Sequence, residues 1–264
     1  MAKQTILTSI YGAHAENLER TFSSFIGKSE AELHAFVLGE SLPERRVAGV
    51  TYHLVSPENT FGHPYREVCY RRWEYLDELD ADYGLVVDGT DVLCLQRLPP
   101  FEKLLRGMSV AGCAEHRGGR YIQGQGYTGS YLNAGVTWWD VRQSKSMREM
   151  ICARGRARCR VIHDDQMTLN EVVHTCYYDD LALLPSQYNY RAFLDVRRRG
   201  WPTVRHLDGV VIYHNGTCIE RALALRDRKS RASLRPLRPT SPPRSALAHC
   251  MLRVLNRFRP HLAE

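Results

Sequence analysis

The sequence predicts a single α/β domain built on a mostly parallel central sheet that is flanked by helices. The chain has 264 residues, enough for one large domain with a buried core. Apolar residues make up 44% and charged residues 25%, as in an ordinary globular protein. Strand-like and helix-like segments alternate along the chain, and this alternation is typical of a parallel sheet whose strands are connected by helices.

Short apolar and β-branched segments predict the strands. Residues 4–10 alternate and are rich in β-formers, so they predict the first strand. Residues 83–87 (YGLVV) are almost wholly apolar, as in strands that are buried on both faces of a parallel sheet. The other predicted strands are 33–38, 50–55, 109–114, 131–141 and 210–213.

Apolar residues at helical spacing predict the helices. The strongest case is 65–79, where Val68, Trp73 and Leu76 fall on one side. The other predicted helices are 15–26, 101–106 and 164–174. The Gly-rich segment 118–129 has the composition of a mobile loop.

The positive charge of the chain is concentrated in its C-terminal tail. Residues 224–264 hold ten Lys and Arg against two acidic residues, a net charge of +8. Because the whole chain carries +7, residues 1–223 sum to −1. A near-neutral body argues against a nucleic-acid-binding protein, and no nucleic-acid partner is expected.

The tail predicts a second unit with its own character. We place a catalytic domain at 1–229 and a tail at 230–264. Residues 231–244 are rich in Pro, Ser and Arg and predict a linker, and residues 245–258 predict a basic amphipathic helix. Such a helix suits an anionic membrane surface, and it equally suits docking on the body of the protein or on a partner.

The N-terminus and the cysteines bear on location. The first residues lack the long apolar stretch of a secretory signal, so we expect a cytoplasmic protein, peripheral on the inner face of the membrane if the tail binds there. The eight cysteines include no Cys-x-x-Cys pair, so we expect reduced thiols rather than a disulfide or zinc framework.

Two carboxylates follow the apolar strand at 83–87. Asp88 and Asp91 lie three residues apart with Gly89 between them, and a glycine there would allow a tight turn that lets both side chains converge. Two converging carboxylates suit Mg²⁺ or Mn²⁺, which bind protein carboxylates together with substrate phosphates. The alternative is an Asp-Gly turn in which both residues only cap backbone groups.

A histidine follows the last predicted strand. His214, before Asn215 and Gly216, would lie at the same sheet edge as Asp88 and Asp91. A neutral imidazole can complete a Mn²⁺ site of two carboxylates and one histidine. The alternative is a histidine that is hydrogen-bonded at a strand end.

Two further segments place short polar side chains beside apolar elements. Asn133 stands in Leu-Asn-Ala-Gly, and Asp164 and Asp165 stand in His-Asp-Asp-Gln. These groups can hydrogen-bond the hydroxyls of a sugar. The alternatives are a turn at Asn133 and a helix N-cap and first turn at Asp164 and Asp165.

In their order along residues 4–216, the four segments resemble those of glycosyltransferase family 8. The resemblance is closest to the glucosyltransferase domain of the procollagen lysyl hydroxylases. Those enzymes have the GT-A fold, with an acidic motif after an apolar strand, a Leu-Asn-Ser-Gly-like segment, an Asp-Asp-Gln segment and a late histidine. The resemblance implies a GT-A-like, Rossmann-type domain. It also implies a metal-dependent transfer of a hexose from a UDP-sugar to a hydroxyl acceptor, with retention of configuration.

The resemblance also implies roles for individual residues. Asp88, Asp91 and His214 would bind Mn²⁺, or Mg²⁺, and hold the donor diphosphate, with Gly135 and Gly216 beside them. Asn133, Asp164 and Asp165 would contact the donor sugar or the reacting centre. The remaining donor-binding residues would be Thr8, Ser9 and Tyr11 at the uridine, and Arg71, or its neighbour Arg72, at the phosphates or sugar.

This sequence departs from the family pattern at two places. Ala134 stands where the family has serine, and the Gly and Lys that often follow the late histidine have no clear match.

The acceptor would be a glycan, a lipid-linked saccharide or another small hydroxyl compound.

A sugar nucleotidyltransferase is the alternative enzyme class, since it also uses an α/β sheet and paired acids. It usually has a Gly-rich loop with Lys or Arg after the first strand, whereas residues 8–14 here contain one glycine and neither Lys nor Arg.

Overall fold

The computed structural model describes residues 2–114, 121–122, 126–127, 131–157, 164–191 and 209–214. The predicted linker, the C-terminal amphipathic helix and the domain boundary at 229/230 lie outside these residues, as does most of the predicted Gly-rich loop. Within the described part of the chain, no helix is long and apolar enough to cross a membrane.

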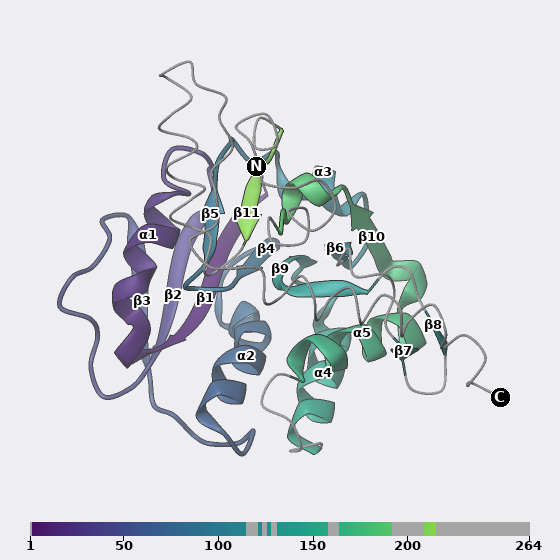
Figure 1. Ribbon diagram of the computed structural model, residues 1–264, viewed down its shortest axis with the longest axis horizontal. Helices are drawn as coiled ribbons and strands as arrows, with labels where there is room; N and C mark the ends of the chain where they lie inside the picture. The colour runs from purple at the N-terminus through teal and green to yellow at the C-terminus, as the bar shows by residue number, and fades with distance from the viewer. Residues whose placement is uncertain are drawn as a thin grey trace, which may run out of the picture.

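The core of the protein is a seven-stranded, mostly parallel sheet (Figure 1). In spatial order its strands are β10 (Leu181–Leu184), β6 (Val110–Ala114), β9 (Leu132–Asp140), β4 (Tyr83–Val87), β1 (Gln4–Tyr11), β2 (Glu32–Leu38) and β3 (Val50–Val55). Strand β9 runs antiparallel to its neighbours β4 and β6, and the other strand pairs are parallel. The predicted α/β class with a mostly parallel sheet is therefore confirmed.

Helices cover both faces of this sheet (Figure 1). One face packs against α1 (Leu18–Ser23) and α3 (Phe101–Leu105), and the other against α2 (Pro64–Glu74), α4 (Lys145–Ala157) and α5 (Asp165–Cys176). Adjacent strand residues point to opposite cores: Trp138 lies with α1 and α3, and Trp139 with α2, α4 and α5. Among the described residues there are also four 3-10 segments: η1 (Gly12–Asn17), η2 (Tyr75–Glu78), η3 (Tyr178–Asp180) and η4 (Ser186–Tyr188).

In the part of the chain that the structure describes, two small antiparallel sheets lie outside the main one. Strand β5 (Val92–Cys94) pairs with β11 (Ile212–His214), and β7 (Tyr121–Ile122) pairs with β8 (Gly126–Tyr127). The predicted last strand, 210–213, is observed as β11, which pairs with β5 and not with the central sheet, and His214 is the last residue of β11 rather than the residue after it. The short strand β5, directly after Asp91, supplies the partner that β11 uses instead.

Two predicted helices are shorter than expected. The segment 15–26 divides into η1 and α1, which ends at Ser23, and Gly27 then has a φ of +74°. The segment 65–79 ends as α2 at Glu74 and tightens into η2. The start of α2 is well defined, because the His63 side chain accepts a hydrogen bond from the Tyr65 amide and Pro64 occupies the first turn.

The cysteines that the structure describes are free thiols, as expected. Cys69, Cys94, Cys113 and Cys152 are buried, and Cys176 is exposed. Burial raises the pKa of the Cys94 thiol to about 12, so this thiol stays protonated at neutral pH.

Gly155 allows α4 to lie against α2, which generates a prediction about stability. A Cβ atom at this position would be 2.3 Å from Cε1 of Tyr70. In an open helix, Gly→Ala stabilises by about 1 kcal/mol, whereas overpacking a filled core costs about 1–3 kcal/mol. We expect Gly155→Ala to lower the free energy of unfolding, measured by urea denaturation. Glu149→Ala, on the exposed side of the same helix, is the control. A Gly155→Ala variant that is more stable than wild type would contradict this packing.

Candidate active site and metal centre

Three potential metal ligands meet at the carboxyl end of β4. Asp88 follows the last residue of that strand, and Asp91 follows three residues later. The register of β11 places His214 opposite Val92, next to Asp91. Nε2 of His214 lies 3.3 Å from Oδ2 of Asp88 and 3.5 Å from Oδ1 of Asp91. One ligand atom from each residue lies within 4.8 Å of the other two.

Strand β9 explains how its first residues reach the same place. Because β9 is antiparallel to β4, its beginning lies beside the end of β4, with Val136 paired to Val87. One step further on, the Asp88 amide donates a hydrogen bond of 2.8 Å to the Gly135 carbonyl. Asn133 and Gly135 are thereby brought to the edge where the parallel strands end.

The residues present fit a divalent cation. A Cβ atom on Gly135 would lie 2.2 Å from Oδ2 of Asp88 and 2.3 Å from Cε1 of His214, so only a glycine leaves the space beside these ligands open. Two carboxylates and one imidazole form a donor set that Mn²⁺ accepts. The Asp88 and Asp91 side chains are 38% and 22% exposed, so a ligand can reach them from solvent.

Electrostatics at this point also favour a cation. Burial acts to lower the pKa of His214, but the carboxylates of Asp91 and Asp88 outweigh it and raise that pKa. A site that stabilises a positive charge on an imidazole stabilises a metal ion for the same reason.

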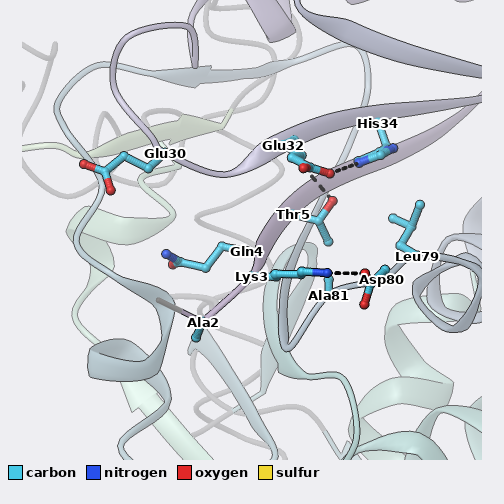
Figure 2. A pocket seen from close by; sticks show the side chains of 10 residues that line it. All are labelled: Ala2, Lys3, Gln4, Thr5, Glu30, Glu32, His34, Leu79, Asp80 and Ala81. Atoms are coloured by element: carbon cyan, nitrogen blue, oxygen red, sulfur yellow. Dashed lines mark hydrogen bonds and ion pairs between the residues drawn. The ribbon is translucent and has the colours of Figure 1, made fainter.

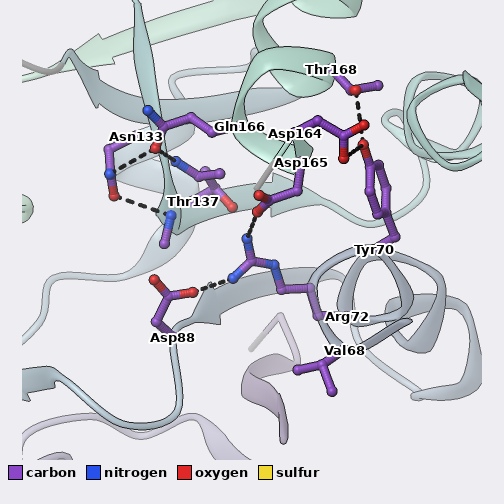
Figure 3. A network of polar contacts seen from close by, with 12 residues as sticks. Val68, Tyr70, Arg72, Asp88, Asn133, Thr137, Asp164, Asp165, Gln166 and Thr168 are labelled. Carbon is purple, nitrogen blue, oxygen red and sulfur yellow. Dashed lines mark hydrogen bonds and ion pairs between the residues drawn. The ribbon is translucent and has the colours of Figure 1, made fainter. Parts of the chain in front are cut away.

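Arg72 joins the candidate metal ligand Asp88 to helix α5. Its guanidinium forms ion pairs with Asp88 and, at 2.8 Å, with Asp165, the first residue of α5 (Figure 3). The Arg72 side chain is 4% exposed. Burial acts to raise the pKa of Asp88, but Arg72 and His214 outweigh it and hold that pKa below its usual value. Burial raises the pKa of Asp165, which Arg72 opposes and the Asp88 charge reinforces.

The two adjacent aspartates of α5 have different environments. The Asp164 carboxylate is buried, binds both Nε and Nη2 of Arg66 at 3.1 and 3.0 Å, and accepts a hydrogen bond from the Tyr70 hydroxyl. Its side chain does not cap the helix. Both of its oxygens are engaged away from the metal ligands, whereas Asp165 faces them through Arg72 (Figure 3).

Buried amides connect the remaining parts of the site. Nδ2 of Asn133 donates to Oε1 of Gln166 at 2.9 Å, and Oδ1 of Asn133 accepts from Nδ2 of Asn189 at 3.0 Å. Oδ1 of Asn189 lies 3.0 Å from Nδ1 of His214. Asn170 clamps the start of β9 by bonding both the amide and the carbonyl of Leu132.

Comparison with solved structures identifies this architecture. A structure of an active-site mutant of LgtC superposes with a TM-score of 0.61 at 18% sequence identity, covering 92% of this chain and 98% of LgtC. The structure of galactosyltransferase LgtC in complex with donor and acceptor sugar analogues gives a TM-score of 0.59 at 16% identity, over 93% of this chain and 99% of that one.

The chain has the GT-A fold of the galactosyltransferase LgtC.

A third match is the WbbM bifunctional glycosyltransferase, with a TM-score of 0.55 at 13% identity, over 81% of this chain and 45% of WbbM. No family model and no curated protein sequence matches the chain. The GT-A fold is thus established by structure, as the sequence resemblance implied.

Within this GT-A fold, the residues predicted for the uridine occupy the end of β1. The Ser9 hydroxyl is buried and donates to the Val68 carbonyl, and Thr8 is also buried, with its hydroxyl 3.5 Å from the Ser9 carbonyl. Tyr11, the last residue of β1, is partly exposed. Of the three, Tyr11 is therefore the side chain with access to a ligand. Gly216 lies outside the described residues.

Arg71 and Arg72 point in different directions. Arg71 binds Glu67 at 2.9 Å and also pairs with Glu58, while Arg72 pairs with Asp88 and Asp165. The geometry favours Arg72 as the arginine of the site. The sequence pattern alone did not distinguish Arg72 from Arg71. Gln166 and Asn189 had no assigned role in the sequence, although Gln166 belongs to the Asp-Asp-Gln segment.

Residues 89–91 form the expected turn after β4, and Gly89 adopts it without a positive φ. Its lack of a side chain matters because a Cβ would lie 3.0 Å from Oγ1 of Thr8 and 3.3 Å from both Ile10 and Leu18. The glycine lets the loop after β4 lie close to β1.

A separate hollow lies at the opposite edge of the sheet, beside the first residues of β1 and β2 (Figure 2). Its volume is about 310 Å³. Its charged groups have partners, since Lys3 pairs with Asp80, Glu32 lies 3.4 Å from His34, and Glu30 pairs with Arg97. Ligands of open α/β sheets bind at the carboxyl ends of the strands, which again favours the Asp88 edge.

The space beside Gly135 generates a prediction about metal binding. We expect Gly135→Ala to weaken Mn²⁺ binding by at least about 100-fold, more than the loss of an outer-shell partner, because the new methyl group would occupy the space between Asp88 and His214. Binding can be measured by titrating free Mn²⁺ by electron paramagnetic resonance.

Gly112→Ala in β6 is the matched control, because a Cβ there meets its nearest neighbour at 3.5 Å, an ordinary contact. If Gly135→Ala binds Mn²⁺ as tightly as Gly112→Ala does, the metal does not bind beside Gly135 between Asp88 and His214.

Proposed function

We propose that the protein is a metal-dependent glycosyltransferase that transfers a hexose from a UDP-sugar to a hydroxyl acceptor with retention of configuration. The observation that carries this proposal is the convergence of Asp88, Asp91 and His214 at the carboxyl edge of a GT-A sheet. The acceptor is a glycan, a lipid-linked saccharide or another small hydroxyl compound. The tail at 230–264 is our candidate for contact with an anionic membrane surface on the cytoplasmic side.

Different residues act on the diphosphate, the uridine and the sugar of the donor. Asp88, Asp91 and His214 would hold Mn²⁺ or Mg²⁺, which would supply positive charge to the diphosphate as it leaves. Tyr11 and the end of β1 hold the uridine. The C1–O bond of the sugar breaks with its electrons going to the diphosphate, and the acceptor oxygen bonds to C1 from the same face. The acceptor proton passes to a departing diphosphate oxygen.

Asp165 is our candidate for the carboxylate nearest C1, where positive charge develops on the sugar. Its ion pair with Arg72 fixes its position relative to Asp88 and therefore to the metal site. Gln166, which is only partly buried, presents its amide beside it for sugar hydroxyls, and the buried Asn133, which donates to Gln166 at 2.9 Å, holds that amide in place. Asp164 has a structural role, because its buried ion pair with Arg66 holds the start of α5 in place.

The decisive test is metal-dependent turnover of a panel of nucleotide sugars. We expect Mn²⁺-dependent release of the nucleoside diphosphate from one donor by the wild type. In Asp91→Ala we expect this release to fall by more than about 100-fold, since a metal ligand is lost. Asp80→Ala is the control, because the Asp80 side chain is 88% exposed and pairs with Lys3 far from the site. If the wild type shows no turnover and no metal-dependent nucleotide binding, the proposal is refuted.

A second comparison separates the two neighbouring arginines. Lysine keeps the charge of arginine but cannot bridge two carboxylates with a planar fork. We therefore expect Arg72→Lys to lower kcat/KM by about 10- to 100-fold, corresponding to about 1.4–2.7 kcal/mol of transition-state stabilisation.

Arg71→Lys is the matched substitution one residue away. Its partners Glu58 and Glu67 lie outside the cluster, so we expect kcat/KM to change by less than about threefold. A larger loss in Arg71→Lys than in Arg72→Lys would reverse this assignment and restore Arg71 as the donor-binding arginine.

A further inference from the structure

A line of buried amides runs from the metal ligand His214 to helix α5. Asn189 contacts His214 on one side and Asn133 on the other, each at 3.0 Å. Asn133 in turn reaches Gln166, the second residue of α5, at 2.9 Å. Asn133 and Asn189 are each 3% exposed and His214 is 2% exposed, so water cannot readily replace these partners.

Backbone groups determine which way each amide points. The Ala134 amide can only donate, and it donates to Oε1 of Gln166, so the group that Asn133 directs at the same oxygen must be its NH₂. The Gly135 amide likewise donates to Oδ1 of Asn133. That oxygen then accepts from the NH₂ of Asn189.

The orientation of Asn189 fixes the histidine. With its NH₂ directed at Asn133, Asn189 directs its Oδ1 at Nδ1 of His214. Nδ1 must therefore carry the proton and donate it to this oxygen. In the neutral imidazole, Nε2, which faces Asp88 and Asp91 at 3.3 and 3.5 Å, then carries the lone pair that a metal ion would bind.

Main-chain pairing places Asn189 for this role. The Tyr190 amide donates to the Ile212 carbonyl and the His214 amide donates to the Tyr190 carbonyl, both at 2.9 Å. The segment that carries Asn189 therefore runs beside β11 on the side opposite β5.

We propose that Asn189 is a positioning residue for the metal centre, which holds His214 in the Nδ1-protonated form with Nε2 directed at the metal position. Through Asn133 and Gln166, the same amides tie the metal ligand to the start of α5, where Asp165 lies. The inference rests on the metal site of the proposed function, but it needs neither the donor nor the acceptor to be known.

The test compares Mn²⁺ affinity with stability in two variants of Asn189. Asn189→Ala removes the acceptor for Nδ1, and we expect it to weaken Mn²⁺ binding by about 10- to 100-fold. Asn189→Asp keeps an oxygen acceptor for Nδ1 but cannot donate to Asn133, so we expect a lower Tm with Mn²⁺ affinity within about threefold of wild type. A purely structural role would make affinity follow Tm in both variants, which would overturn the proposal.

A spectroscopic measurement on the wild type removes the dependence on variants that fold poorly. With Zn²⁺ bound in place of Mn²⁺, a long-range ¹H–¹⁵N spectrum shows which nitrogen of His214 carries the proton. We expect a protonated Nδ1 and a metal-bound Nε2, and a metal-bound Nδ1 would overturn the proposal. Absence of any Mn²⁺ binding by the wild type would instead refute the metal site itself, and with it the proposed function.

Discussion

The candidate site depends on the ion pairs that Arg72 makes with Asp88 and Asp165. Three carboxylates, Asp88, Asp91 and Asp165, gather at one edge of the sheet, and their mutual repulsion would separate them without a counter-charge. One buried guanidinium offsets one of these charges and leaves two, which a divalent cation would neutralise. The two ion pairs of Arg72 also fix the distance between Asp88 and Asp165, because they link the loop after β4 to the first residue of α5. The candidate metal ligands and Asp165 are therefore held as one unit by a side chain that need not contact substrate.

The fold supplies this unit by a combination of strand directions. Parallel strands β1 and β4 bring their carboxyl ends to one edge, and the antiparallel strand β9 brings its beginning to the same edge. Gly135 then lies opposite Asp88 with space beside it. On the other side, the small β5–β11 sheet carries His214 to Asp91. Buried polar networks fix the surrounding elements: Asp164 with Arg66 and Tyr70 at the start of α5, and Asn170 at the start of β9.

The sequence predicts the parts of this structure that depend on local pattern. The strands of the central sheet other than β10 and the strongest helix were predicted within a few residues, and the order of the motifs, through the family resemblance, predicted the GT-A fold. It also predicted the three residues that the structure brings together as potential metal ligands, although not that His214 reaches them from a small separate sheet. Helix α4 was missed because its apolar residues are interrupted by arginines, and one of these, Arg148, is buried against the Trp73 and Val141 carbonyls. Tertiary hydrogen bonds of this kind leave no periodic signal. The role of Asn189 was not predicted for the same reason. The choice between Arg71 and Arg72 could not be predicted either, since the two adjacent helix positions point in different directions but carry the same side chain.

The central claim is that Asp88, Asp91 and His214 together bind one divalent cation. The most direct measurement is anomalous diffraction at the manganese absorption edge, from crystals of the protein grown with MnCl₂ and UDP. The account predicts one strong anomalous peak that is bonded to all three side chains, with the diphosphate of UDP as a further ligand. A map without a peak there, or with manganese bound elsewhere while UDP occupies the carboxyl edge of the sheet, would contradict it.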